Sequence, residues 1–139
     1  MQKGWYTTAF LIVLVALSIA RGVTTPAQLN ANQRLRAAEA YGDHLFHSPS
    51  LGANHRSCDS CHIDGGRFSH RLGSRRIPSL IGAKTQFPLV QANGHVETLE
   101  AEINACLVHF MRGQPLPPTS RRLAVLDLYI RHLSRFHER

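Results

Sequence analysis

The sequence lacks the residues that most cysteine-based or metal-based frameworks need. Its 139 residues include only three cysteines, an odd number that makes a poor disulfide framework. A structural zinc site needs four ligands, commonly two Cys/His pairs at matched spacings, and no second pair is present. The chain also lacks internal repeats and strand-like alternation of apolar residues, which disfavours repeat and all-β folds. Its length suits one domain with a modest core.

Long hydrophobic runs are scarce as well, and the single one lies near the N-terminus. The run "AFLIVLVALSIA" at residues 9–20 follows Lys3 and ends in a small-x-small pattern. This arrangement predicts a signal peptide over residues 1–20. Counted over residues 4–23, the same stretch reaches spanning length, so an N-terminal membrane anchor is the alternative. Either way we expect an exported, periplasmic domain at residues 27–139.

The short stretch "RSCDSCHIDGG" has two cysteines three residues apart with a histidine directly behind them. The C-x-x-C-H order is specific to c-type haem attachment. The thiols of Cys58 and Cys61 would form thioethers with the haem vinyl groups, and His62 would be the proximal iron ligand. The motif occurs once, so it predicts one covalently attached haem c.

The remaining pattern predicts helices around such a group. Apolar residues at spacings of three and four indicate a helix over residues 27–46, in which Gly42 would allow another helix to approach closely. Further helices are predicted over residues 96–110 and within the segment 115–136. Residues 65–94, rich in Gly, Pro, Ser and Arg, are expected to form a loop. The predicted fold class is all-α and class I cytochrome c-like, with about three main helices around one haem.

Three segments carry a more specific resemblance. "SCDSCHIDGGR", "FPLVQANGHVETLEAEINAC" and "FMRGQPLPPTSRRLAVLDLYIRHLS" resemble one haem domain of the thiosulfate dehydrogenases and of the related haem subunits of the Sox thiosulfate-oxidising complex. The resemblance covers residues 41–135. It implies a cysteine as distal iron ligand in an "I-N-x-C" segment, which Ile103 to Cys106 matches. A following "S-M-N-G" segment is matched in part by Phe110 to Gly113.

The distal ligand can also be considered from helical geometry. Cys106 lies three residues after Ile103 and seven after Leu99, so it faces the expected core. Met111, five residues further on, would be turned about 140° away on a continuous helix. It remains the alternative ligand if the helix ends between the two. Cys106 is favoured because of the matched motif, and the weaker candidates are His95, His109 and Lys84.

The resemblance leaves carrier and enzyme open as functions. Thiosulfate is a dianion, and the enzymes resembled here typically carry an arginine four residues before the ligand cysteine, where this chain has Glu102. Joining two thiosulfates also releases two electrons, whereas one haem accepts one, so a second haem protein or a homodimer would be needed. One-electron transfer is therefore the favoured function. The alternatives are a sulfur-compound oxidoreductase in which Cys106 takes part, and a haem subunit of a membrane-tethered redox complex.

Positive charge is abundant and comes almost wholly from arginine. The net charge is +7, and four arginines (Arg67, Arg71, Arg75 and Arg76) follow the haem motif closely. They could dock an acidic redox partner, pair with the haem propionates, recruit an anionic substrate, or form a solvated loop without a partner. Nucleic acid is not an expected partner of an exported haem domain.

Overall fold

The computed structural model describes residues 25–137, so the predicted signal peptide or anchor at residues 1–20 lies outside the described part. The chain divides into two compact units, Met1–Arg34 and Leu35–Arg139. The described part of the first unit is the beginning of helix α2 (Pro26–His47), and its residues are all exposed. Within residues 25–137 no helix is both long and apolar enough to cross a bilayer.

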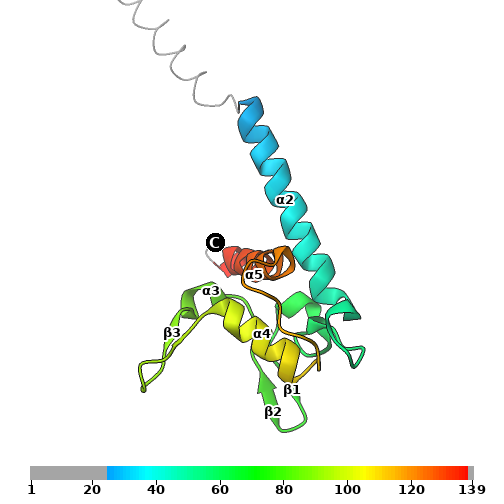
Figure 1. The fold of residues 1–139 in the computed structure, drawn as a ribbon, viewed down its shortest axis with the longest axis vertical. Helices are drawn as coiled ribbons and strands as arrows, with labels where there is room; N and C mark the ends of the chain where they lie inside the picture. The colour runs from blue at the N-terminus through cyan, green and yellow to red at the C-terminus, as the bar shows by residue number, and fades with distance from the viewer. Residues whose placement is uncertain (1–24, 138–139) are drawn as a thin grey trace, which may run out of the picture. The chain divides into compact units, whose positions relative to one another are not determined.

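The second unit is mainly helical (Figure 1). After the end of α2 come three further helices: α3 (Ala83–Gln86), α4 (Leu99–His109) and α5 (Arg121–Leu133). Two small antiparallel hairpins accompany them, β1 (His70–Leu72) with β2 (Arg75–Ile77), and β3 (Leu89–Val90) with β4 (Val96–Glu97). Helix α5 packs against both α3 and α4. The expected fold class, with three main helices, is confirmed.

Two details differ from the expectation. Residues 65–94 are not one loop, because they contain the β1–β2 hairpin, α3 and strand β3. The second main helix begins at Leu99 rather than 96, because Val96 pairs with Val90 in the other hairpin. Strands of two or three residues are too short to show a period in the sequence, which explains both errors.

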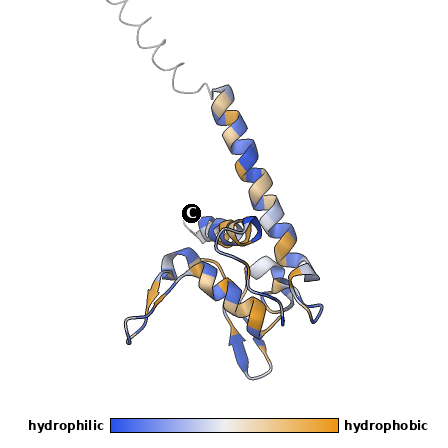
Figure 2. Ribbon diagram, viewed as in Figure 1, coloured by the Kyte–Doolittle hydropathy of each residue, from blue (hydrophilic) through white to orange (hydrophobic). Residues whose placement is uncertain are grey.

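The core forms along the apolar stripe of α5. Leu123, Leu126, Ile130 and Leu133 are all buried, as the spacing predicts. In Figure 2 this helix alternates between hydrophobic and hydrophilic bands, as expected for a helix with one buried face. The end of α2 and the face of α4 complete the cluster through Leu45, Phe46, Ile103 and Leu107. The core thus joins the three main helices.

Helices α2 and α5 approach each other closely at Gly42. A Cβ atom built there would lie 2.9 Å from the Cβ atom of Tyr129, and it would overlap the backbone carbonyl of Val125. Backbone atoms in the middle of a helix cannot move aside without shifting the whole helix. Only glycine therefore allows this crossing, as the sequence suggested.

The crossing gives a first prediction. Gly42→Ala is expected to lower the free energy of unfolding by about 3 kcal/mol, because overpacking against backbone outweighs the gain in helix propensity. Urea unfolding followed by far-UV circular dichroism measures this change. His44→Ala, at an exposed position of the same helix, is the matched control and should change stability by less than about 0.5 kcal/mol. A Gly42→Ala protein as stable as the wild type would contradict the close crossing.

Candidate functional site

The C-x-x-C-H motif folds into a tight turn. The backbone N–H groups of Cys61 and His62 both donate to the carbonyl of Cys58, at 3.1 and 2.9 Å. The N–H of Ser57 donates to the hydroxyl of Ser60 at 3.0 Å and fixes the start of the turn. The two cysteines and the histidine are therefore presented from a single rigid loop.

Two glycines follow this turn, and a side chain of α5 bonds to the first of them. Gly65 and Gly66 have φ angles of 63° and 85°, in the left-handed region that favours glycine. The N–H of Gly65 donates to Asp59 at 2.8 Å, and its carbonyl accepts from the Tyr129 hydroxyl at 2.9 Å. Burial, with a smaller effect of Asp43, raises the pKa of Tyr129 to about 12, so the hydroxyl keeps the proton that it donates. The loop behind the motif is thus tied to the core.

His62 is half-buried next to Phe46, with 6.5 Å between the ring centroids. Its Nδ1 atom is buried without a hydrogen-bond partner. Burial lowers the pKa of His62. The backbone of Pro78 acts on this pKa in the opposite direction and more weakly. A lowered pKa favours the neutral imidazole, which is the form that binds a metal.

The two motif cysteines are free thiols in a partly apolar setting. Cys58 packs against the hydrophobic core, and burial raises its pKa to about 11. Cys61 adds a smaller effect in the same direction, so the two sulfur atoms lie within electrostatic range of each other. Both free thiols therefore lie in the same turn and within electrostatic range of each other.

The third cysteine, Cys106, lies on α4 and comes close to the motif. Burial raises its pKa to about 12, with further contributions from Glu102 and then from Cys58 and Cys61. Since such effects act only over short distances, the fold brings Cys106 near the two motif thiols, which lie more than 40 residues earlier in the sequence. The predicted distal ligand thus lies near the predicted attachment residues.

Two carboxyl groups accompany Cys106. The thiol donates to Glu102 at a sulfur–oxygen distance of 3.8 Å. Burial raises the pKa of Glu102, and the nearby Glu97 of β4 raises it further. Gln91 holds Glu97 through an amide hydrogen bond of 3.2 Å. The sequence analysis identified Glu102 but missed Glu97, because their contact depends on a hairpin that the sequence does not reveal.

Helix α4 ends between Cys106 and Met111. The last helical residue is His109, and the N–H groups of Phe110 and Met111 both donate to the Cys106 carbonyl, at 3.1 and 3.3 Å. The Met111 side chain is buried in the core cluster. Met111 therefore remains an alternative ligand, since that alternative requires the helix to end between Cys106 and Met111. Cys106 and Met111 both stay predictions for the distal position.

Asn104, within the "I-N-x-C" segment, has a structural role that the sequence analysis did not assign. Its side-chain amide donates to the carbonyl of Leu116 at 2.9 Å, and its oxygen accepts from the N–H of Leu116 at 2.8 Å. This pair of bonds clamps the proline-rich connection to α5 onto α4. The position of Cys106, two residues further along α4, depends on the same clamp.

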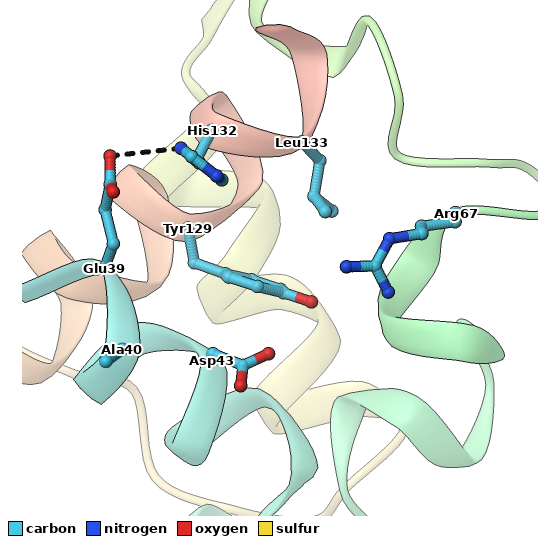
Figure 3. A pocket seen from close by; sticks show the side chains of 7 residues that line it. All are labelled: Glu39, Ala40, Asp43, Arg67, Tyr129, His132 and Leu133. Carbon is cyan, nitrogen blue, oxygen red and sulfur yellow. Dashed lines mark ion pairs between the residues drawn. The ribbon is translucent and has the colours of Figure 1, made fainter. Parts of the chain in front are cut away.

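The weaker ligand candidates lie elsewhere: His95 is exposed in the β3–β4 hairpin, His109 is exposed at the end of α4, and Lys84 is half-buried on α3. A pocket of about 230 Å³ lies among residues of α2, α5 and Arg67 (Figure 3). It includes the ion pair between Glu39 and His132, at 3.1 Å. No cysteine lines it, so it is separate from the motif.

The residues of the motif fit a haem c. Two adjacent free thiols can form thioethers, and a half-buried imidazole biased towards its neutral form can bind iron. Large apolar side chains next to the motif are exposed and would be covered by a large apolar ring. They are Ile63 and Phe68, which are 40 and 59 % exposed. The donor set and the apolar surroundings agree with the sequence motif.

Comparison with known proteins supports the same conclusion. The family model described as "SoxA/TsdA, cytochrome c domain" matches residues 41–138. A search of curated proteins gives no match. Among solved structures, the chain is similar to thiosulfate dehydrogenase (TsdBA) from Marichromatium purpuratum in its "as isolated" form, with a TM-score of 0.59 and 23% identity.

The similarity to that structure concerns the fold. The match covers 72% of this chain but only 23% of the other, so this chain spans about a quarter of the length of the solved protein. The family model, in contrast, covers most of the chain and includes both the C-x-x-C-H motif and the α4–α5 segment. The chain belongs to the SoxA/TsdA cytochrome c domain family.

Proposed function

We propose that this chain binds one haem c covalently and transfers single electrons in the periplasm. The observation that supports this function best is the turn that presents Cys58, Cys61 and His62 together, with Cys106 of α4 within electrostatic range of both thiols. Export, and with it the periplasmic location, rests on the apolar run at residues 9–20. Retention of that run as an anchor would make the chain a haem subunit of a membrane-tethered redox complex.

Each residue of the site would have a different role in holding the cofactor. A bound haem c supplies a one-electron iron couple. Cys58 and Cys61 would anchor the group, His62 would bind the iron through its imidazole, and Cys106 or Met111 would supply a sulfur ligand. Tyr129 and the two glycines fix the loop that carries His62. A rigid site of this kind keeps the reorganisation on electron transfer small, which suits a carrier.

The second candidate function is oxidation of a sulfur compound, with Cys106 taking part in the chemistry. It is favoured by the position of Cys106 beside the motif cysteines and by the family. Glu102 disfavours it, because a carboxyl group 3.8 Å from the sulfur, backed by Glu97, opposes the approach of a dianion. A second haem protein or a second copy of the chain would also be needed to accept two electrons.

Thiosulfate turnover by the haem-loaded protein, measured with an artificial electron acceptor, tests the two functions. We expect a turnover number below about 0.1 per second, far under the usual range for enzymes. Reduction and reoxidation of the same sample by small redox reagents should be fast and complete. Glu102→Gln removes the charge but keeps the shape, and serves as the variant in which any latent activity would appear.

Two outcomes would reverse this ranking. Rapid tetrathionate formation by the wild type would make the oxidoreductase the primary function. A large gain in Glu102→Gln alone would show that the chain keeps a working site that one carboxyl group blocks. If neither protein turns over thiosulfate while both exchange electrons, the carrier function stands.

A further inference from the structure

The β1–β2 hairpin carries an arginine pair that makes the hairpin itself less stable. Arg71 and Arg76 are direct partners in the antiparallel register, and both are exposed. Like charges opposite each other on two strands repel and destabilise the pairing. Within residues 25–137 neither arginine forms an ion pair. Nothing inside the described fold compensates for the repulsion.

The other face of the hairpin contacts the end of α4. The guanidinium of Arg75 lies 4.9 Å from the centre of the Phe110 ring, and Ile77 is buried. Leu72, the strand partner of Arg75, is half exposed, and so is Phe110. Figure 2 shows β2 as a hydrophilic strand next to the hydrophobic end of α4. Apolar and cationic side chains are therefore mixed at this edge.

A third segment brings more positive charge to the same edge. The amide of Asn54 donates to the carbonyl of Phe110 at 3.0 Å, which places residues 53–57 beside the end of α4. We define the basic face as the exposed arginines of these segments, on both sides of the hairpin, together with the two exposed apolar side chains at the Arg75 side: Arg56, Arg71, Arg75, Arg76 and Arg112, with Leu72 and Phe110. Residues 53–57, 70–77 and 108–114 contain no Asp or Glu.

The basic face lies at the edge of the candidate haem site. Strand β1 begins at His70, eight residues after His62, so the hairpin directly follows the loop that carries the motif. Arg75 in the partner strand contacts Phe110, four residues after Cys106. The hairpin therefore links the segment of the predicted proximal ligand with the segment of the predicted distal ligands. A protein bound to this face would be next to the site from which electrons leave or enter.

On the basis of the proposed electron-transfer function, we propose that the basic face docks an acidic protein redox partner. Arginine pairs with carboxylates through two parallel hydrogen bonds, and clustered arginines steer an acidic protein during diffusion. The exposed Phe110 and Leu72 beside Arg75 match the composition of protein interfaces, in which aromatic residues and arginine are enriched. The repulsion between Arg71 and Arg76 would be relieved by carboxylates of the partner.

Stopped-flow reduction of the haem-loaded full chain by reduced flavodoxin, used as an acidic protein probe, tests the proposal. In Arg71→Glu/Arg76→Glu the second-order rate constant is expected to fall about tenfold at low ionic strength, and the difference should vanish in high salt. Arg36→Glu/Arg122→Glu makes the same change in net charge at exposed positions outside the basic face. Its rate constant should change by less than about twofold.

Further measurements distinguish a failure of the docking proposal from a failure of the electron-transfer function. Reduction by dithionite, a small reagent, should be equally fast in all variants; a wild type that dithionite does not reduce contradicts the proposed electron transfer itself. Equal losses in the two double variants would show a net-charge effect and overturn the docking face. A shifted reduction potential in Arg71→Glu/Arg76→Glu would place the arginines on the haem carboxylates and overturn it too.

A membrane surface is the remaining rival for these arginines. Vesicles containing phosphatidylglycerol, mixed with the protein and sedimented, reveal binding to an anionic lipid surface. Loss of vesicle binding in Arg71→Glu/Arg76→Glu, without loss of the flavodoxin rate, would assign the face to lipid and contradict the proposal. Arg71→Gln/Arg76→Gln, which relieves the repulsion without adding acid, should remain folded and lose an intermediate part of the rate.

Discussion

Replacing Cys58 and Cys61 together by alanine is expected to abolish covalently bound haem. Both expected thioethers would come from this turn, in which the backbone bonds to the Cys58 carbonyl hold the two cysteines on one loop. Haem staining after denaturing electrophoresis measures the covalent fraction, because denaturation removes haem held only by iron ligands. We expect less than about a tenth of the wild-type stain, since His62 alone does not survive this treatment.

The control for this experiment is Cys106→Ala. It removes a thiol that lies near the motif but outside it, so the stain should stay at the wild-type level. Single Cys58→Ala and Cys61→Ala variants should keep part of the stain through the remaining thioether. Full staining of the double variant would contradict covalent attachment at these positions. Lost staining in Cys106→Ala would mean that Cys106 is needed for attachment, contrary to its predicted role as a ligand.

The sequence predicts the helices well because each has a strong local pattern. The α5 stripe of Leu123, Leu126, Ile130 and Leu133 is buried as its spacing indicates. Gly42 correctly indicates the α2–α5 crossing, because a glycine inside a helix with one apolar face usually has a packing reason. The prediction of covalent haem attachment rests on a five-residue motif that can be recognised without knowing the rest of the fold.

The surroundings of the site could not be predicted in the same way. Glu97 beside Glu102, and Arg75 over Phe110, are contacts made by hairpins whose strands have only two or three residues. Such strands carry too little pattern to be recognised, and their register determines which side chains meet. Asn104 was noticed as part of a motif, but its bonds to Leu116 depend on where a proline-rich connection folds back.

The identity of the distal ligand has the largest expected effect on the redox properties of the protein. A thiolate carries negative charge and stabilises ferric over ferrous iron, whereas the thioether of methionine raises the reduction potential. With Cys106 as ligand, the potential should therefore be low, and Cys106→Ala should raise it by on the order of a few hundred millivolts. Electron paramagnetic resonance of the oxidised wild type should show a low-spin thiolate signal, which Cys106→Ala abolishes.

Met111→Ala is the matched variant, and the structure explains why the pair is informative. Helix α4 ends at His109, so Cys106 on the helix and Met111 beyond it are not held to opposite sides by one continuous helix. Met111 lies buried in the core, whereas Cys106 is half-buried next to the motif thiols. With Cys106 as ligand, Met111→Ala should therefore lower the free energy of unfolding by about 2 to 5 kcal/mol but leave the thiolate signal unchanged.

If instead the wild type shows a histidine–methionine spectrum that only Met111→Ala alters, Cys106 is not the ligand. The sulfur-oxidising alternative would then lose its reacting group, and a plain electron carrier would remain.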